Sequence, residues 1–474
     1  MSRSVLALFV ITFLVPSLSA AAPPSHVMLI LLDDSGWTDF GCYGSQIDTP
    51  NVDRFASESM RFTDCHSAAP NCSPSRCGLL TGRTPSRAGI FSYLPGGHVM
   101  HLRDEEVTIA ELLKDAGYRT GHFGKWHLSR LRSTQPQPAD QGFEESLGTD
   151  NNASPSHLNP DNFVRNGSPV GPTKGYSCQL VVDATLDWLK TQTNENEKTF
   201  SCVWFHEPHT PIASPPELVA KYQKQFPKLK KKHAEYYANI ENVDRAVGRL
   251  LAGMNSLGMT EDTLVFLTSD NGPLNAFSKG ELRGRKSHVW EGGHRVPGVF
   301  RWPGKIEPDS VCEVPICGVD FLPTVCDAVG IAPPNDRVLD GHSLLPLLIG
   351  DAKSITRKRP LYWFFYRLNP AIAMREDDWL LIAQSDDWKR PKAHPLLRED
   401  IPFIKNSRPI EFELYHLKDD LSQRVDRAKS EPTRLTAMVE RLRGMHREVL
   451  DEAPSWDIPE TYQKDAKKKI WSSE

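Results

Sequence analysis

The sequence predicts an α/β protein built on a large doubly wound, mostly parallel sheet with flanking helices. Two observations support this fold class. Short, continuous apolar runs, which suit strands buried on both faces, alternate with segments of helical spacing. Each run also ends in polar residues, as expected at the edge where such a sheet binds ligands. The apolar runs lie at residues 26–32, 118–124, 200–205 and 264–268.

The segments between these runs carry helical signals. Residues 108–115 are amphipathic and are followed by Gly117, a helix stop signal. Residues 180–192 and 235–257 also show apolar positions at helical spacing. The lysine-rich stretch at 221–232 indicates a solvated helix face rather than a site for an acidic polymer.

The first 21 residues have the layout of a secretory signal peptide. Arg3 precedes an apolar run at residues 5–15, and small residues follow at 17–22. The run is shorter than the ~20 residues that span a bilayer, and no later stretch approaches that length. We therefore expect cleavage around residues 20–22 and export to a periplasmic, extracellular or other secretory compartment. A retained anchor is the alternative.

The character of the sequence changes after Gly350. We expect a large catalytic domain over residues 24–350 and a smaller α+β domain over residues 351–474, made of antiparallel strands covered by a helix. The strand-like segments are 361–365, 379–382 and 411–415, and the helical stretch is 432–450.

Charge and cysteine content narrow the class of protein. The net charge is -4, with mixed signs along most of the chain, so no general affinity for nucleic acid is expected. Nine cysteines in an exported protein permit disulfides, and Cys312 and Cys317 are close enough in sequence to pair. Because the count is odd, at least one cysteine stays unpaired. Asn152 and Asn166 begin glycosylation sequons.

Residues 72–83 predict an anion site at the start of a helix. Pro74 suits the first turn, and Gly82 suits the end of the helix. Cys72 then lies at the helix N-terminus, where free N–H groups favour an anion, and Arg76 lies about one turn further on. The alternative is a buried cysteine before an ordinary helix.

Two strand ends carry oxygen donors: Asp33 and Asp34 after the first run, and Asp270 and Asn271 after the last. Hard oxygen ligands suit calcium or magnesium. Adjacent carboxylates would also repel one another strongly if they were buried without a cation. For Asp33 and Asp34 alone, a turn after a strand is the alternative interpretation.

The segment 72–83 reads Cys-Ser-Pro-Ser-Arg-Cys-Gly-Leu-Leu-Thr-Gly-Arg and resembles the signature of type I sulfatases in the alkaline phosphatase superfamily. The resemblance implies that a formylglycine-generating maturation enzyme oxidises Cys72 to formylglycine, an aldehyde whose hydrate attacks the sulfur of a sulfate ester. Cys77 and Gly78 replace the alanines usual after the arginine, a change that is tolerable in volume.

Further elements follow in the family's chain order. They are Gly-Lys-Trp-His at 124–127, Pro-His-Thr-Pro at 208–211, and Glu-Gly-Gly-His-Arg-Val-Pro at 291–297. Glu291, Arg295 and Pro297 of the last element are expected to be structural, and His294 stands where an aliphatic residue is common.

The resemblance also implies roles for these residues. Arg76, Lys125 and Lys286 would offset the charge of the sulfate group, His209 would protonate the departing alcohol, and His127 would act as the base. Calcium is the implied ion, ahead of magnesium. Its implied ligands are Asp33, Asp34, Asp270, Asn271 and the modified Cys72.

Residues 335–341 and their surroundings look closest to the arylsulfatase A and N-acetylgalactosamine-6-sulfatase branch. That likeness implies a sulfated sugar of the galactose or N-acetylgalactosamine type. Aromatic faces and imidazoles suit sugar rings and hydroxyls, although each such residue could equally be packing. The candidate sugar contacts are Trp126, His206, His288 and Trp290.

Two other functions remain open from the sequence. A phosphodiester or phosphonate monoester hydrolase could use the same aldehyde and metal. A non-catalytic protein that binds sulfated glycans is the alternative from another class. That alternative predicts the loss of at least one reactive residue, and the sequence retains all of them: Cys72, Arg76, Lys125, His127, His209 and Lys286.

Overall fold

The computed structural model describes residues 23–194, 197–367, 371–386 and 396–464. The predicted signal peptide at residues 1–21 lies outside these ranges and stays a prediction. Within them, no helix combines the length and the apolar character needed to cross a membrane.

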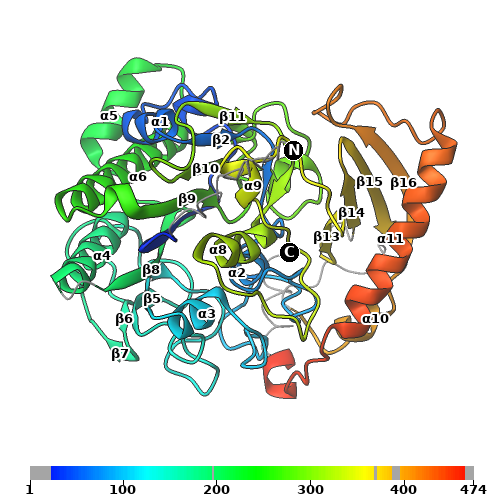
Figure 1. Cartoon of the computed structure of the whole chain (residues 1–474), viewed down its shortest axis with the longest axis horizontal. Helices are drawn as coiled ribbons and strands as arrows, with labels where there is room; N and C mark the ends of the chain where they lie inside the picture. The colour runs from blue at the N-terminus through cyan, green and yellow to red at the C-terminus, as the bar shows by residue number, and fades with distance from the viewer. Residues whose placement is uncertain (1–22, 195–196, 368–370, 387–395, 465–474) are drawn as a thin grey trace, which may run out of the picture.

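A ten-stranded sheet forms the centre of the molecule (Figure 1). Its five middle strands are parallel, and the strands outside them include antiparallel pairs, which confirms the predicted mostly parallel sheet. In spatial order the middle strands are β9 (Thr263–Ser269), β1 (His26–Asp33), β8 (Lys198–Pro208), β4 (Tyr118–Lys125) and β5 (Glu145–Thr149). The outer strands are β11 (Ser310–Cys312), β2 (Met60–Phe62) and β10 (Gly298–Arg301) on one side, and β6 (Val164–Arg165) and β7 (Ser168–Pro169) on the other.

Both faces of the sheet are covered because alternate residues of its strands point to opposite sides. On β1, Leu29 and Leu31 belong to one buried apolar cluster, whereas Ile30 and Leu32 belong to another. The first cluster contains α2 (Cys72–Thr81), α3 (Ile109–Asp115), α8 (Phe321–Val329) and α9 (Leu345–Leu348). The second contains α1 (Pro50–Ser57), α4 (Ser177–Asn194), α5 (Pro216–Gln225) and α6 (Lys231–Ser256) (Figure 1). The three helices predicted from spacing correspond to α3, α4 and α6.

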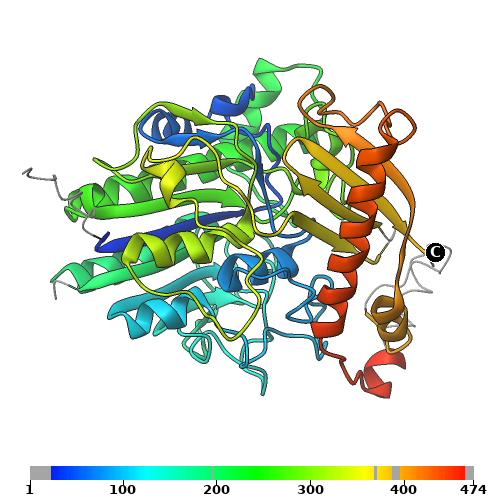
Figure 2. The same ribbon diagram turned by 45° about the vertical axis from the view of Figure 1, so that its right-hand side comes forward.

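A second sheet of four antiparallel strands follows in the C-terminal part, with the long helix α11 (Pro432–Glu452) running across it (Figure 2). The prediction of antiparallel strands and a covering helix is confirmed. One strand, β14, was not predicted, because its sequence Ala-Ile-Ala-Met-Arg-Glu has little β-branched character. The strands are β13 (Leu361–Phe365), β14 (Ala371–Glu376), β15 (Trp379–Ser385) and β16 (Pro409–His416), and α10 (Asp400–Asn406) lies beside them.

All nine cysteines lie in described residues and all are free. The suggested pairing of Cys312 with Cys317 is therefore wrong for this structure. Cys312 ends β11, which pairs with β2, whereas Cys317 lies in β12 (Ile316–Cys317), which pairs with β3 (Cys65–His66). Because the two residues belong to different sheets, their closeness in sequence does not bring them together.

Candidate active site

Four strand ends bring polar side chains to one edge of the parallel sheet. Asp33 is the last residue of β1, and Lys125 is the last residue of β4. Asp270 follows β9 directly, and His209 follows β8. Parallel strands end at the same edge, so four segments far apart in the sequence meet there.

Helix α2 brings Cys72 to this edge. The helix begins at Cys72 and is buried along its whole length. Gly82 ends it in the left-handed conformation (φ 67°), with its N–H bonded to Gly78 O, as the sequence predicted. Burial raises the pKa of the Cys72 thiol to about 12, although Lys125 and Lys286 oppose this shift. An unmodified Cys72 is therefore a neutral thiol near pH 7 and a poor nucleophile.

Lys286 reaches the site on a tightly folded loop. Its backbone N–H donates to Pro273 O at 3.0 Å, and Gly272 N–H donates to Gly293 O at 2.9 Å. A Cβ at Gly293 would lie 1.8 Å from the carbonyl oxygen of His288, so only glycine permits this approach. The loop places Lys286 Nζ 2.6 Å from Asp34 Oδ1 and 3.2 Å from Cys72 Sγ.

Three carboxylates and three basic side chains interlock around Cys72. Lys125 Nζ lies 2.6 Å from Asp33 Oδ2, and Arg76 donates to Asp270 Oδ2 at 3.0 and 2.7 Å. Burial raises the pKa of Asp270 to about 7, and the charge of Asp33 adds to that shift. Burial also acts to raise the pKa of Asp33, but Lys125 and the other cations hold it well below its usual range.

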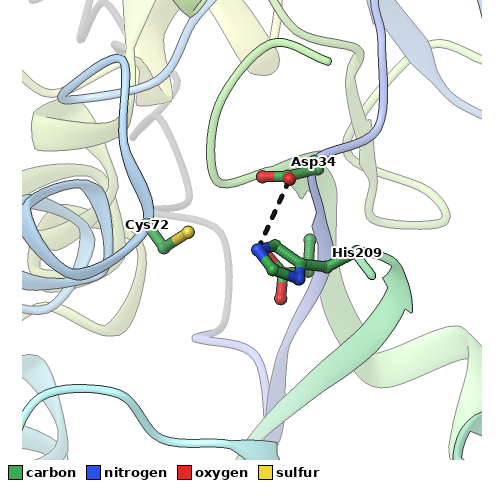
Figure 3. A group of neighbouring side chains, drawn as sticks. Asp34, Cys72 and His209 are labelled. Carbon is green, nitrogen blue, oxygen red and sulfur yellow. Dashed lines mark ion pairs between the residues drawn. The ribbon is translucent and has the colours of Figure 1, made fainter. Parts of the chain in front are cut away.

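Oxygen atoms without partners identify a place for a cation. Asp33 Oδ1, Asp34 Oδ2 and Asn271 Oδ1 are buried and accept no hydrogen bond within the described chain. Ligand atoms of Asp33, Asp34, Cys72 and His209 all lie within 4.8 Å of one another. In Figure 3 the Cys72 sulfur points toward the Asp34–His209 pair. A group rich in oxygen donors fits calcium or magnesium, and a divalent ion would satisfy the partnerless oxygens.

Two histidines flank this cluster with different environments. His127 Nε2 bonds Leu94 O at 3.0 Å, and its Nδ1 has no partner among the described residues. Burial, reinforced by Lys125 and Arg76, holds the pKa of His127 well below its usual range, so it is neutral. His209 Nε2 lies 3.6 Å from Asp34 Oδ2. Burial lowers the pKa of His209 to about 4, with the Asp34 charge opposing.

The four candidate sugar contacts divide into two groups. Trp126 and His206 are fully buried, with Trp126 Nε1 bonded to Ser129 and His206 Nε2 bonded to Thr149. Neither ring is exposed, and both pack inside the protein, but His206 Nδ1 has no hydrogen-bond partner among the described residues, so a sugar contact stays a prediction for these two. His288 and Trp290 are partly exposed and stacked with centroids 5.3 Å apart, so both remain candidates.

Asn152 is a site neighbour that the sequence analysis read only as a glycosylation sequon. Its Oδ1 lies 3.4 Å from Lys125 Nζ, and its amide donates to Thr210 O at 2.9 Å. The sequence offered no clear signal for it, because β5, the strand that precedes it, reads Glu-Ser-Leu-Gly-Thr and has no apolar run.

Comparison with known proteins decides the family. The sulfatase family profile matches residues 25–331. The chain belongs to the sulfatase family. A second profile, described as N-sulphoglucosamine sulphohydrolase, C-terminal, matches residues 284–392 of this sulfatase. The protein is thus a sulfuric ester hydrolase.

Named relatives agree with this assignment. The sulfatase is 33% identical to N-acetylgalactosamine-6-sulfatase of Canis lupus familiaris over 392 residues, covering 75% of this chain and 71% of the relative. It is 34% identical to human arylsulfatase A over 371 residues, covering 71% and 70%. The structure of Ps i-CgsB in complex with k-i-k-neocarrahexaose aligns with a TM-score of 0.79 at 25% identity, covering 95% of this chain and 98% of that one.

Proposed function

We propose that this sulfatase removes sulfate from a sulfated saccharide of the galactose or N-acetylgalactosamine type, using formylglycine at position 72 and a calcium ion. The observation that carries the proposal is the position of Cys72. Its Sγ lies 3.2 Å from Lys286 Nζ and within 4.8 Å of ligand atoms of Asp33, Asp34 and His209. The names of the relatives support the class of sugar.

The charges of the site suit an anionic ester. Three carboxylates face three basic side chains, so the protein groups nearly cancel; they are Asp33, Asp34, Asp270, Arg76, Lys125 and Lys286. A divalent ion on the partnerless oxygens would leave the site positive. A positive, buried site stabilises a sulfate ester and the charge that develops on its leaving oxygen.

The protein's own residues then have distinct tasks. When bound, calcium would supply positive charge, and formylglycine would supply a hydroxyl nucleophile as its hydrate. Arg76, Lys125 and Lys286 hold the sulfate oxygens by charge-assisted hydrogen bonds. Each of these three side chains is at most 10% exposed. A sulfate group that they hold is therefore shielded from water.

The two histidines handle protons at defined atoms. His209 Nδ1 donates to Thr210 O at 2.6 Å, so Nε2 is the atom that delivers a proton to the departing alcohol oxygen. Because burial lowers the pKa of His209 to about 4, this ring is neutral near pH 7 in the free protein; the carboxylate of Asp34 opposes that shift, and the negative charge of a bound ester would favour the protonated ring further. His127 donates from Nε2 to Leu94 O, which leaves the lone pair of Nδ1 to take the proton of the residue 72 hydroxyl.

The predicted signal peptide adds a proposal on location and maturation. We infer that the chain is exported, and that a formylglycine-generating enzyme acts on Cys72 before the fold closes around it, since Cys72 is 2% exposed when folded. N-terminal sequencing of the mature protein tests the first inference. Cleavage after residue 20, 21 or 22 is the expected result, and an intact Met1 would contradict it.

One mass measurement and one assay test the proposed chemistry. The tryptic peptide that contains residue 72 should weigh about 18 Da less than the cysteine form, as expected for conversion to the aldehyde. Purified protein should release sulfate from galactose or N-acetylgalactosamine sulfates faster than it cleaves phosphonate monoesters. An unmodified peptide in active protein, or a preference for phosphonates, would reject the proposal.

A further inference from the structure

Arg367 is a buried cation whose donors are mostly unused. It follows strand β13 and is 3% exposed. Its Nη1 donates to Ser92 Oγ at 2.7 Å, but Nε and Nη2 have no hydrogen-bond partner within the described chain. No ion pair joins it to an acidic side chain of the described residues, although the charge of Asp400 acts on the adjacent Tyr366. Because a buried guanidinium without a counter-charge is costly, the arrangement indicates that an anion completes it.

Other unused donors surround the guanidinium. The hydroxyls of Tyr366 and Tyr462 are buried and have no partner in the described ranges. Burial raises the pKa of both hydroxyls, and the charge of Arg367 opposes that shift, while the charge of Asp400 adds to it at Tyr366; both hydroxyls therefore lie within range of the Arg367 charge. The guanidinium carbon also lies 4.8 Å from the ring centroid of Tyr93. We call this group, made of Tyr93, Tyr366, Arg367 and Tyr462, the Arg367 subsite.

The Arg367 subsite borders the reaction centre. The ring of Tyr93 lies 6.5 Å from that of His127, and the next residue, Leu94, accepts the hydrogen bond of His127 Nε2. Leu94 N–H also donates to Ser73 Oγ, next to Cys72. Segment 92–94 therefore contacts Arg367 on one side and the catalytic residues on the other.

The reaction centre and the Arg367 subsite are buried to a similar extent. Cys72 and His127 are each 2% exposed, and Arg367 is 3% exposed. A substrate that reaches Cys72 must therefore enter surroundings as enclosed as those of Arg367. Segment 92–94 is next to any ester bound at Cys72, because Leu94 bonds both Ser73 and His127.

We propose that the Arg367 subsite binds a second oxyanion of the substrate, either a carboxylate or an additional sulfate on the saccharide. Guanidinium N–H and tyrosine O–H groups together match the geometry and charge of such a group. The proposal rests on the proposed function, and it narrows the substrates to saccharides with at least two anionic groups. It also gives the C-terminal sheet a part in choosing them.

Equilibrium binding to a Cys72→Ala protein tests the proposal without turnover. The probes are N-acetylgalactosamine 6-sulfate, its 4,6-disulfate, and a disaccharide that joins the 6-sulfate to a uronic acid. We expect at least one doubly charged probe to bind roughly 10- to 100-fold more tightly than the monosulfate. Adding Arg367→Gln should remove that preference and leave monosulfate binding within about twofold. The probe that loses affinity shows whether the second oxyanion is a sulfate or a carboxylate.

Two milder variants exclude a purely structural role for this subsite. Tyr366→Phe and Tyr462→Phe each delete only a hydroxyl that has no protein partner, so the fold should be retained. At least one of them should weaken binding of the preferred doubly charged probe severalfold and leave the monosulfate unaffected.

Equal weakening of all probes by Arg367→Gln, or an unchanged preference in all three variants, would overturn the proposal. Failure of the proposed function looks different: the unaltered protein would then release sulfate from none of these esters. In that case the present inference is overturned with it.

Discussion

Two buried clusters of charged side chains differ in how completely they are paired. The reaction centre at the edge of the parallel sheet leaves one carboxylate oxygen of Asp33 and one of Asp34 without a hydrogen-bond donor among the described residues. The other cluster, which we call the Asp64–Glu291 cluster, joins β3, α7 (Glu291–His294) and the C-terminal sheet. Its members are Asp64, His66, Glu291, Arg295 and Arg375.

The carboxylates of the Asp64–Glu291 cluster are fully engaged. Arg375 holds Asp64 through two bonds, at 2.8 and 2.5 Å, and Arg295 donates to Glu291 Oε2 at 2.9 Å. His66 Nε2 lies 3.1 Å from Glu291 Oε2. Two histidines and a glutamate here have spacing that could hold a metal ion, but the two arginines already supply the positive charge. A further cation would therefore be repelled.

The comparison separates a structural network from a binding site. Similar numbers of buried charges occur in both clusters, so burial and charge alone do not mark function. Carboxylate oxygens without a hydrogen-bond donor distinguish the two clusters, because a buried charged oxygen without a donor destabilises the protein until a ligand binds. The expectation that Glu291 and Arg295 are structural agrees with this geometry.

Replacing Cys72 by alanine should have the largest effect on activity. Removal of a nucleophile typically lowers kcat by at least ~10³-fold, and the small change in volume should leave the fold intact. Sulfate release and thermal unfolding measure the two quantities. Cys77→Ala, five residues along the same buried helix, is the matched control and should keep most of the activity. Full-rate turnover by Cys72→Ala would mean that position 72 is not the reacting residue.

Glu291→Gln should instead act on stability. The substitution leaves Arg295 and His66 buried with reduced pairing, and breaking such a pair costs about 3–5 kcal/mol of unfolding free energy. Denaturant unfolding measures this loss, while kcat per folded molecule should stay within about twofold. Glu376→Gln is the control, because its partner Arg441 is 63% exposed and surface pairs contribute about 0–1 kcal/mol. Comparable losses in both variants would refute the distinction between the clusters.

Calcium should stabilise the reaction centre and not the Asp64–Glu291 cluster. Saturation at about 100 times the dissociation constant adds about 2.7 kcal/mol to the unfolding free energy. Asp34→Asn should abolish most of this gain, since it weakens a carboxylate with a partnerless oxygen. Asp64→Asn should keep the gain despite its lower baseline stability. Thermal unfolding with calcium and with a chelator measures this stabilisation. An equal gain in Asp34→Asn and Asp64→Asn would place the ion elsewhere.

Acid should weaken the Asp64–Glu291 cluster through its neighbour His294. Burial lowers the pKa of His294 to about 3, so between pH 3 and its unfolded value of about 6.5 the unfolded state binds more protons. The unfolding free energy therefore falls as pH falls through that window, by up to about 1.4 kcal/mol per pH unit from this residue. His294→Leu should flatten the slope by about one proton. An unchanged slope would show that His294 is not buried in its neutral form.

Much of the site could be predicted because its residues follow local rules. Asp33, Lys125, His209 and Asp270 each stand at the end of an apolar run, and parallel strands end at one edge. The helix from Cys72 to Thr81 also follows from nearby residues, Pro74 within its first turn and Gly82 at its end. The roles assigned to these residues stay proposals, although the structure brings their side chains together.

Other features could not be predicted, because they depend on contacts between distant segments. The burial of Trp126 and His206 depends on neighbours from other strands, and residue type alone does not reveal it. Strand β14 was missed because pairing with β13 and β15, and not its own sequence, makes it a strand.

The sequence by itself determined the alternation of strands and helices, the chain order of the reactive residues, and the helix that begins at Cys72, since spacing and local conformational preference fix all three. Only the tertiary structure decided which buried groups lack a partner. Asp34 and Lys286 are 252 residues apart, and Ser92 and Arg367 are 275 residues apart. Whether a buried polar group has a hydrogen-bond partner depends on how distant segments pack together, and no local sequence pattern encodes it.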